Sequence, residues 1–207
     1  MDIELYSFFF ITTVMLILVP GPAAITVAKQ AVSYNSKLSF LVVFGVASAD
    51  TLFFILSATG IASLLLASTL VFSIIKWLGV VYLLFLGMSA IFSKAGAINI
   101  DSKVTSARPD KAFLQGLLVQ LANPKALMYF AALLPQFINK NEPLLLQIFI
   151  MGMTCFLADL FVYSMFARMA SKFSSNQMRP AVVKFVNKLA GLALIATAVR
   201  MVNVGRN

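Results

Sequence analysis

The chain has 207 residues, of which 61% are hydrophobic and only 11% are charged, and its formal net charge is +9. Soluble domains carry about 45–50% apolar and about 25% charged residues. With a mean hydropathy of +0.96, the chain has too few polar side chains to cover a water-exposed surface. This excludes a soluble enzyme, a disordered chain and a coiled coil, and it predicts an integral membrane protein.

Six apolar runs reach about 20 residues, the length that a helix needs to cross a bilayer. They predict an all-α polytopic membrane protein with helices over 5–27, 40–66, 70–92, 112–134, 144–167 and 183–204. The first run is not a signal peptide, because the acidic Asp2 and Glu4 stand where a signal needs basic residues. Lysine and arginine concentrate in the first, third and fifth loops, which predicts cytoplasmic loops there and both termini outside.

The basic residues lie between the apolar runs and do not gather on one face, so we expect contacts with the lipid bilayer and no nucleic-acid partner. The chain has no histidine and a single cysteine, Cys155, inside an apolar run. A disulfide and a cysteine-based zinc site are therefore excluded, and we expect neither a metal nor a cofactor. No nucleophile–base set is recognisable, so no catalytic residues are expected and the protein is not predicted to be an enzyme.

The two halves of the chain repeat three features in the same order. The matched segments are PGP (20–22) with NPK (123–125), ADTLF (49–53) with ADLFV (158–162), and KWLG (76–79) with KLAG (188–191). Three helices per half is an odd number, so the second copy must insert upside down. We therefore predict an inverted repeat of two three-helix units, 1–103 and 104–207, in one membrane domain, with a site where broken helices meet near the midplane.

Proline interrupts the first predicted helix at Pro20, Gly21 and Pro22. A proline removes the hydrogen bond to the carbonyl group four residues earlier, so these prolines free the carbonyls of Leu16 and Leu18. In lipid such groups must find a partner in protein, water or ligand.

The fourth predicted helix is interrupted at Asn123, Pro124 and Lys125. Asn is a favoured N-cap and Pro a favoured first helical residue, so we expect a fresh helix to begin at Pro124. Its positive end and the Lys125 ammonium would suit a substrate carboxylate. The alternative for both interruptions is an ordinary proline kink, which membrane helices tolerate.

Two acidic residues, Asp50 and Asp159, lie inside predicted helices at corresponding places in the two halves. An ionisable side chain at the bilayer centre costs about 2.5–3.5 kcal/mol or more, and such residues usually serve ion or substrate pathways. A carboxyl group there can carry a proton, because low dielectric disfavours its charged form. The alternative is a structural ion pair of either residue with Lys125, or a hydrogen bond that locks two helices together.

Several of these motifs together resemble the LysE/RhtB family of amino-acid exporters, over essentially the whole chain. They are VPGP (19–22), FG (44–45) with Asp50, KWLGVVYL (76–83) with Gly87, NPKA (123–126) and LPQF (134–137). The resemblance implies about six spans, export of amino acids from the bacterial cytoplasm across the cytoplasmic membrane, a proton gradient as the driving force, and a homodimer. It also implies that the two breaks and Asp50 form the functional core. Ala49 and 198–199 depart from glycines often found in the family.

The leading hypothesis is a secondary transporter that exports amino acids or close analogues by proton antiport. A second hypothesis is efflux of another small solute or a metal ion, for which the lack of histidine gives a poor transition-metal site. A third is a membrane scaffold that transports nothing, which would have no use for two buried aspartates.

Overall fold

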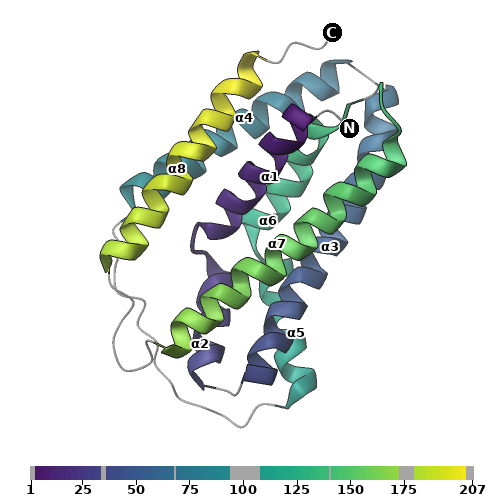
Figure 1. Cartoon of the computed structure of the whole chain (residues 1–207). Coiled ribbons are helices and arrows are strands. Elements are labelled where there is room, and N and C mark those ends of the chain that lie inside the picture. Colours follow the sequence, from purple (N-terminus) through teal and green to yellow (C-terminus); the bar gives the residue numbers. More distant parts are fainter. Residues whose placement is uncertain are drawn as a thin grey trace.

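The computed structural model describes residues 3–33, 36–67, 69–93, 108–139, 141–172 and 180–203. Within these ranges all regular structure is helical and there is no strand, which confirms the all-α part of the prediction. The inverted repeat stays a prediction. The expected boundary between the units 1–103 and 104–207 lies outside the described residues. The helices are α1 (Ile3–Leu18), α2 (Pro22–Ser33), α3 (Ser36–Ala67), α4 (Thr69–Phe92), α5 (Pro109–Leu121), α6 (Pro124–Met128), α7 (Leu144–Lys172) and α8 (Pro180–Asn203) (Figure 1).

Both helices that were expected to be interrupted are broken at their prolines. The chain leaves α1 at Leu18 and enters α2 at Pro22, and the two axes differ by 57°. The second break separates α5 from α6 at Asn123, after which the chain continues through a π-helical turn, η1 (Tyr129–Leu133), and a 3-10 turn, η2 (Leu134–Phe137). Tight and wide turns of this kind interrupt the regular backbone ladder and often mark functional sites in helices.

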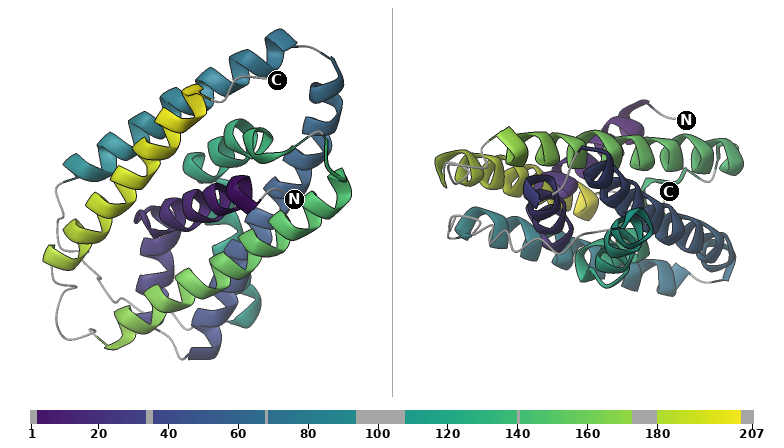
Figure 2. Two further views of the ribbon diagram at one scale, coloured as in Figure 1. Left: turned by 45° about the horizontal axis from the view of Figure 1, so that its top comes forward. Right: turned by 90° about the horizontal axis from the view of Figure 1, so that it is seen from below.

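The helices form a bundle in which segments far apart in sequence lie side by side. Within it, α3 packs against α5 and α7, α2 packs against α7, and α4 packs against α8 along one edge (Figure 2). Both ends of the chain lie at one end of the bundle, together with the start of α7, whereas the end of α2 and the end of α7 lie at the other (Figure 1). The two breaks therefore fall in the middle of the bundle.

The number of spans is only partly supported by the described helices. Three of them are long and apolar enough to cross a membrane: Lys37–Gly60 in α3, Leu144–Lys172, and Lys184–Val202 in α8. The bent pair α1 and α2 makes a fourth if it counts as one span, and Trp77–Phe92 in α4 is a shorter apolar stretch. The count of six spans therefore stays a prediction.

Two helix pairs approach so closely that only glycine fits at the contact. A Cβ atom at Gly116 on α5 would overlap the carbonyl group of Val42 on α3, and one at Gly45 would overlap that of Phe113. Between α4 and α8, a Cβ atom at Gly87 would lie 2.8 Å from the Gly191 carbonyl oxygen. Small residues let membrane helices pack backbone to backbone, where van der Waals contact stabilises the pair.

We expect Gly116→Ala to lower the free energy of unfolding by about 1–3 kcal/mol, because the new methyl group meets rigid backbone and forces α3 and α5 apart. Gly60→Ala is the matched control, since a Cβ atom there would have nothing within 4 Å. The measurement is unfolding of the purified protein in detergent. Equal stability of the two variants would show that the α3–α5 contact is looser than described.

Candidate functional site

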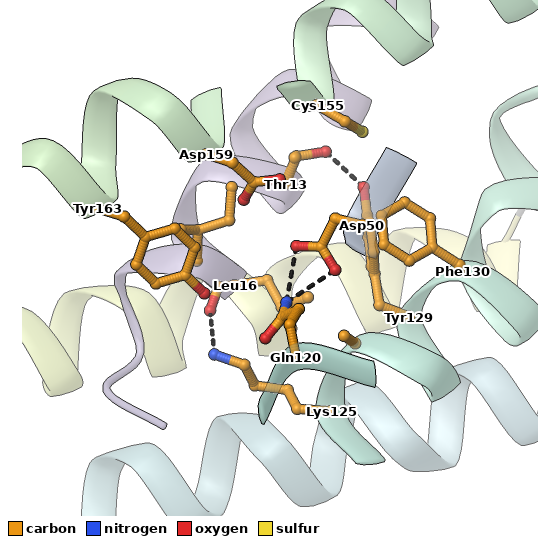
Figure 3. Close-up of a pocket in the computed structure, with 12 residues that line it drawn as sticks. Thr13, Leu16, Asp50, Gln120, Lys125, Tyr129, Phe130, Cys155, Asp159 and Tyr163 are labelled. Carbon is orange, nitrogen blue, oxygen red and sulfur yellow. Dashed lines mark hydrogen bonds between the residues drawn. The ribbon is translucent and has the colours of Figure 1, made fainter. Parts of the chain in front are cut away.

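A small polar cavity lies in the middle of the bundle, where both helix breaks face α3 and α7 (Figure 3). Its volume is about 20 Å³, which is room for roughly one water molecule. Side chains from α1, α3, α5, α6, η1 and α7 form its wall. They are Thr13, Leu16, Ile17, Asp50, Gln120, Lys125, Ala126, Tyr129, Phe130, Cys155, Asp159 and Tyr163.

The break before α6 has the capped geometry that the sequence predicts. Asn123 has an extended backbone, and its side-chain Oδ1 accepts a hydrogen bond from the Lys125 backbone N–H at 3.1 Å. Pro124 occupies the first turn, where the lack of an N–H costs nothing. The N-cap interpretation of Asn123 and Pro124 is therefore confirmed, although the α-helix that begins there is short and passes into η1 after Met128.

The Lys125 side chain joins the two breaks. Its Nζ atom donates hydrogen bonds to the carbonyl oxygens of Leu16, at 2.9 Å, and Val19, at 2.8 Å, at the end of α1. A Cβ atom at Gly21 would lie 3.6 Å from the same Nζ atom, so the bend between α1 and α2 packs directly against the ammonium group. The breaks of the first and fourth predicted helices thus meet at one cation.

This contact explains how a lysine is tolerated in the middle of the bundle. Pro20 cannot donate to the Leu16 carbonyl group, and the Lys125 ammonium takes the place of the missing backbone donor. The end of α1 also carries the negative pole of the helix dipole, which favours a cation. The expected helix-terminus interaction therefore occurs, but in this conformation Lys125 faces the carbonyl end of α1.

Asp50 on α3 is held by a side chain from α5. The Gln120 Nε2 atom donates to both carboxyl oxygens of Asp50 at 2.7 Å, and Gln120 Oε1 accepts from Asn123 Nδ2 at 2.9 Å. Asp50 is only 4% exposed. A continuous line of hydrogen bonds therefore runs from the cap of α6 to this carboxyl group.

Asp159 on α7 faces the same cavity beside Asp50 (Figure 3). It is 1% exposed, and its Oδ1 atom has no hydrogen-bond partner among the described residues. In the described part of the chain, the hydrogen bonds of Lys125 go to α1 and no ion pair joins it to either carboxyl group. The alternative of a direct structural ion pair with Lys125 therefore does not describe this arrangement.

Three polar residues of the site were not singled out from the sequence. Gln120 lies one turn before the second break, and Tyr129 lies one turn after it and shares a hydrogen bond with Thr13 on α1. The sequence does contain a signal for these residues, because each is a polar residue inside an apolar run. Cys155 and Tyr163, which belong to α7 like Asp159, also line the cavity.

Comparison with known proteins shows which family the chain belongs to. The family model described as LysE type translocator matches residues 14–205. The chain belongs to this family. Two similar proteins are named "Homoserine/homoserine lactone efflux protein", one from Salmonella typhimurium (strain LT2) and one from Salmonella typhi. Each is 29% identical over 191 residues, which is 92% of both chains. No solved structure matches.

The hydrogen bonds between Gln120 and Asp50 make a testable energetic prediction. Gln120→Met should lower the free energy of unfolding by about 1–3 kcal/mol, because it removes the two hydrogen bonds that Gln120 Nε2 donates to a buried carboxyl group. Lys111→Met is the control on the same helix, since Lys111 is exposed. Combined with Asp50→Asn, Gln120→Met should be clearly non-additive; additive effects would contradict the contact.

Proposed function

We propose that this LysE-type translocator exports small amino acids or close analogues from the bacterial cytoplasm in exchange for protons. The observation that carries the proposal is the Lys125 ammonium at the junction of two helix breaks, with two buried carboxyl groups around the same cavity. An amino acid carries one carboxylate and one ammonium group, and the cavity offers a partner for each. The names of the two Salmonella relatives support substrates of this class.

Lys125 is the proposed partner of the substrate carboxylate. To bind the substrate carboxylate, the Lys125 ammonium must leave the carbonyl oxygens of Leu16 and Val19. Substrate binding is therefore coupled to the bend between α1 and α2. The cavity of about 20 Å³ is too small for an amino acid, and the helices must part to admit one. The helices can move apart at the two breaks, which act as hinges. One hinge is formed by Pro20, Gly21 and Pro22, and the other by Asn123 and Pro124.

Asp50 and Asp159 are the proposed partners of the substrate ammonium and of the exchanged proton. Two neighbouring buried carboxyl groups repel one another when both are ionised, and either a proton or an ammonium group relieves this repulsion. Since the two compete for the same place, arrival of protons from outside favours release of the substrate there. Competition of this kind is the chemical basis of antiport.

We further propose that the chain crosses the membrane six times as two inverted units, 1–103 and 104–207, with both termini outside. The packing of α3 on α7 and of α4 on α8 supports this, because each pair would be related by the repeat. A cavity of about 290 Å³ between α2, α3 and α7, lined by Ser39, Ser164 and Arg168 among others, would be the cytoplasmic entrance. The homodimer that the family resemblance implies stays a prediction.

Lys125→Met should raise the apparent KM for homoserine export at least about tenfold, the loss expected when one charge-assisted hydrogen bond is removed. Lys125→Arg should restore little, because the planar guanidinium cannot occupy the compact place of an ammonium between Leu16 and Val19. Export by reconstituted vesicles is the measurement, and Lys172→Met, at the exposed end of α7, is the control. Undiminished export by Lys125→Met would refute the proposed role of the ammonium.

Asp50→Asn should fold and reach the membrane but lose export driven by a pH gradient, since the amide cannot carry the proton. Asp50→Glu should keep part of it, and Asp159→Asn should be milder, because Gln120 holds only Asp50 in place. Substrate efflux is measured in vesicles with and without an imposed gradient. If the Asp50→Asn, Asp159→Asn double variant still couples efflux to the gradient, the proton follows another route.

A further inference from the structure

A second cavity, of about 30 Å³, lies between α1, η2 and α8. The cavity is lined by Leu5, Phe8, Gln136, Phe137, Thr197, Arg200 and Met201. The start of α1 and the end of α8 lie at the same end of the bundle (Figure 1). Under the proposed topology this end faces the outside. The proposed roles of Lys125, Asp50 and Asp159 make no use of this cavity.

The polar side chains of this cavity include two strong hydrogen-bond donors, Gln136 and Arg200. The Gln136 Nε2 atom is buried and has no hydrogen-bond partner among the described residues. The Arg200 guanidinium lies 3.4 Å from the centre of the Phe8 ring, and its Nη2 atom donates to Glu4 Oε1 at 2.7 Å. No acidic side chain belongs to the described wall, and the carboxylate of Glu4 matches Arg200 from outside it.

Two neighbouring residues of α1, Thr12 and Thr13, carry hydrogen bonds toward this cavity and toward the central one. Thr197 belongs to the wall of the outer cavity, and its hydroxyl group bonds that of Thr12 on α1 at 3.0 Å. The next residue, Thr13, belongs to the wall of the central cavity and bonds Tyr129. Thr12 and Thr197 are both buried. Polar groups in the membrane interior cost free energy, and each of these hydroxyl groups offsets that cost with a hydrogen bond between helices.

We propose that the outer cavity is a second binding site, in which Arg200 and Gln136 receive the carboxylate of the amino-acid substrate before its release. This rests on the proposed function for the substrate class and the direction of transport. Glu4 occupies Arg200 in the described conformation and is displaced when the substrate arrives. The exchange leaves the charge paired with Arg200 unchanged, because one carboxylate replaces another on the same guanidinium group.

The number of donors available supports this exchange. A guanidinium group carries five N–H donors, and the bond to Glu4 engages one of its nitrogens. A substrate carboxylate inside the cavity can also accept from the buried Gln136 amide, whereas the Glu4 side chain is 72% exposed and competes with water. The substrate therefore gains a buried donor that Glu4 does not use.

The test compares homoserine with homoserine lactone, whose acid group is closed into an ester and offers no carboxylate. Arg200→Gln should raise the apparent KM for homoserine in reconstituted vesicles at least about tenfold, and that for the lactone less than about threefold. Glu4→Gln, an exposed change that leaves the fold intact, should lower the KM for homoserine and leave the lactone unchanged. Arg108→Gln breaks the exposed pair with Asp110 and is the control, with no effect on either compound.

Two results would overturn the second site. One is an equal rise in the apparent KM for both compounds in Arg200→Gln. The other is an unchanged KM for homoserine in Glu4→Gln. Both leave the proposed function standing, because the wild-type protein still transports. A wild-type protein that transported neither compound would overturn the proposed function and this site with it.

Discussion

The ammonium group of Lys125 joins the two helix breaks of this bundle. Lys125 comes from the break between α5 and α6, and it donates to the carbonyl groups of Leu16 and Val19 at the break between α1 and α2. Pro20 leaves the Leu16 carbonyl group without a backbone donor, and the Val19 carbonyl group lies in the break where the helical ladder ends. The ammonium group supplies a donor to both and gains two acceptors in return. If either partner moves, both breaks must rearrange together.

The acidic side of the cavity depends on the same break. Asn123 caps α6 with its Oδ1 atom and uses its Nδ2 atom to hold Gln120, which in turn holds both oxygens of Asp50. Movement of α6 therefore acts on Lys125 directly and on Asp50 through two hydrogen bonds. Asp159 Oδ1 has no such support among the described residues and is the atom best placed to accept the substrate ammonium group.

Local rules in the sequence predict much of this arrangement. The proline positions predict both breaks, Asn123-Pro124 predicts the cap, and the buried aspartates are marked by their cost in lipid. The sequence does not predict that Lys125 faces the carbonyl end of α1, because that contact joins residues more than 100 positions apart. For the same reason it does not pair Gln120 with Asp50, and it does not show that Phe9, Phe54 and Phe130 fill the core while other phenylalanines face outward.

The account depends most on the claim that Lys125 exchanges the end of α1 for the carboxylate of a substrate. A structure of the protein determined with homoserine bound tests this directly. We expect Lys125 Nζ within about 3 Å of a substrate carboxylate oxygen and no longer bonded to Leu16 and Val19, with the substrate ammonium beside Asp159. A structure with homoserine bound elsewhere and Lys125 still on both carbonyl groups would contradict the account.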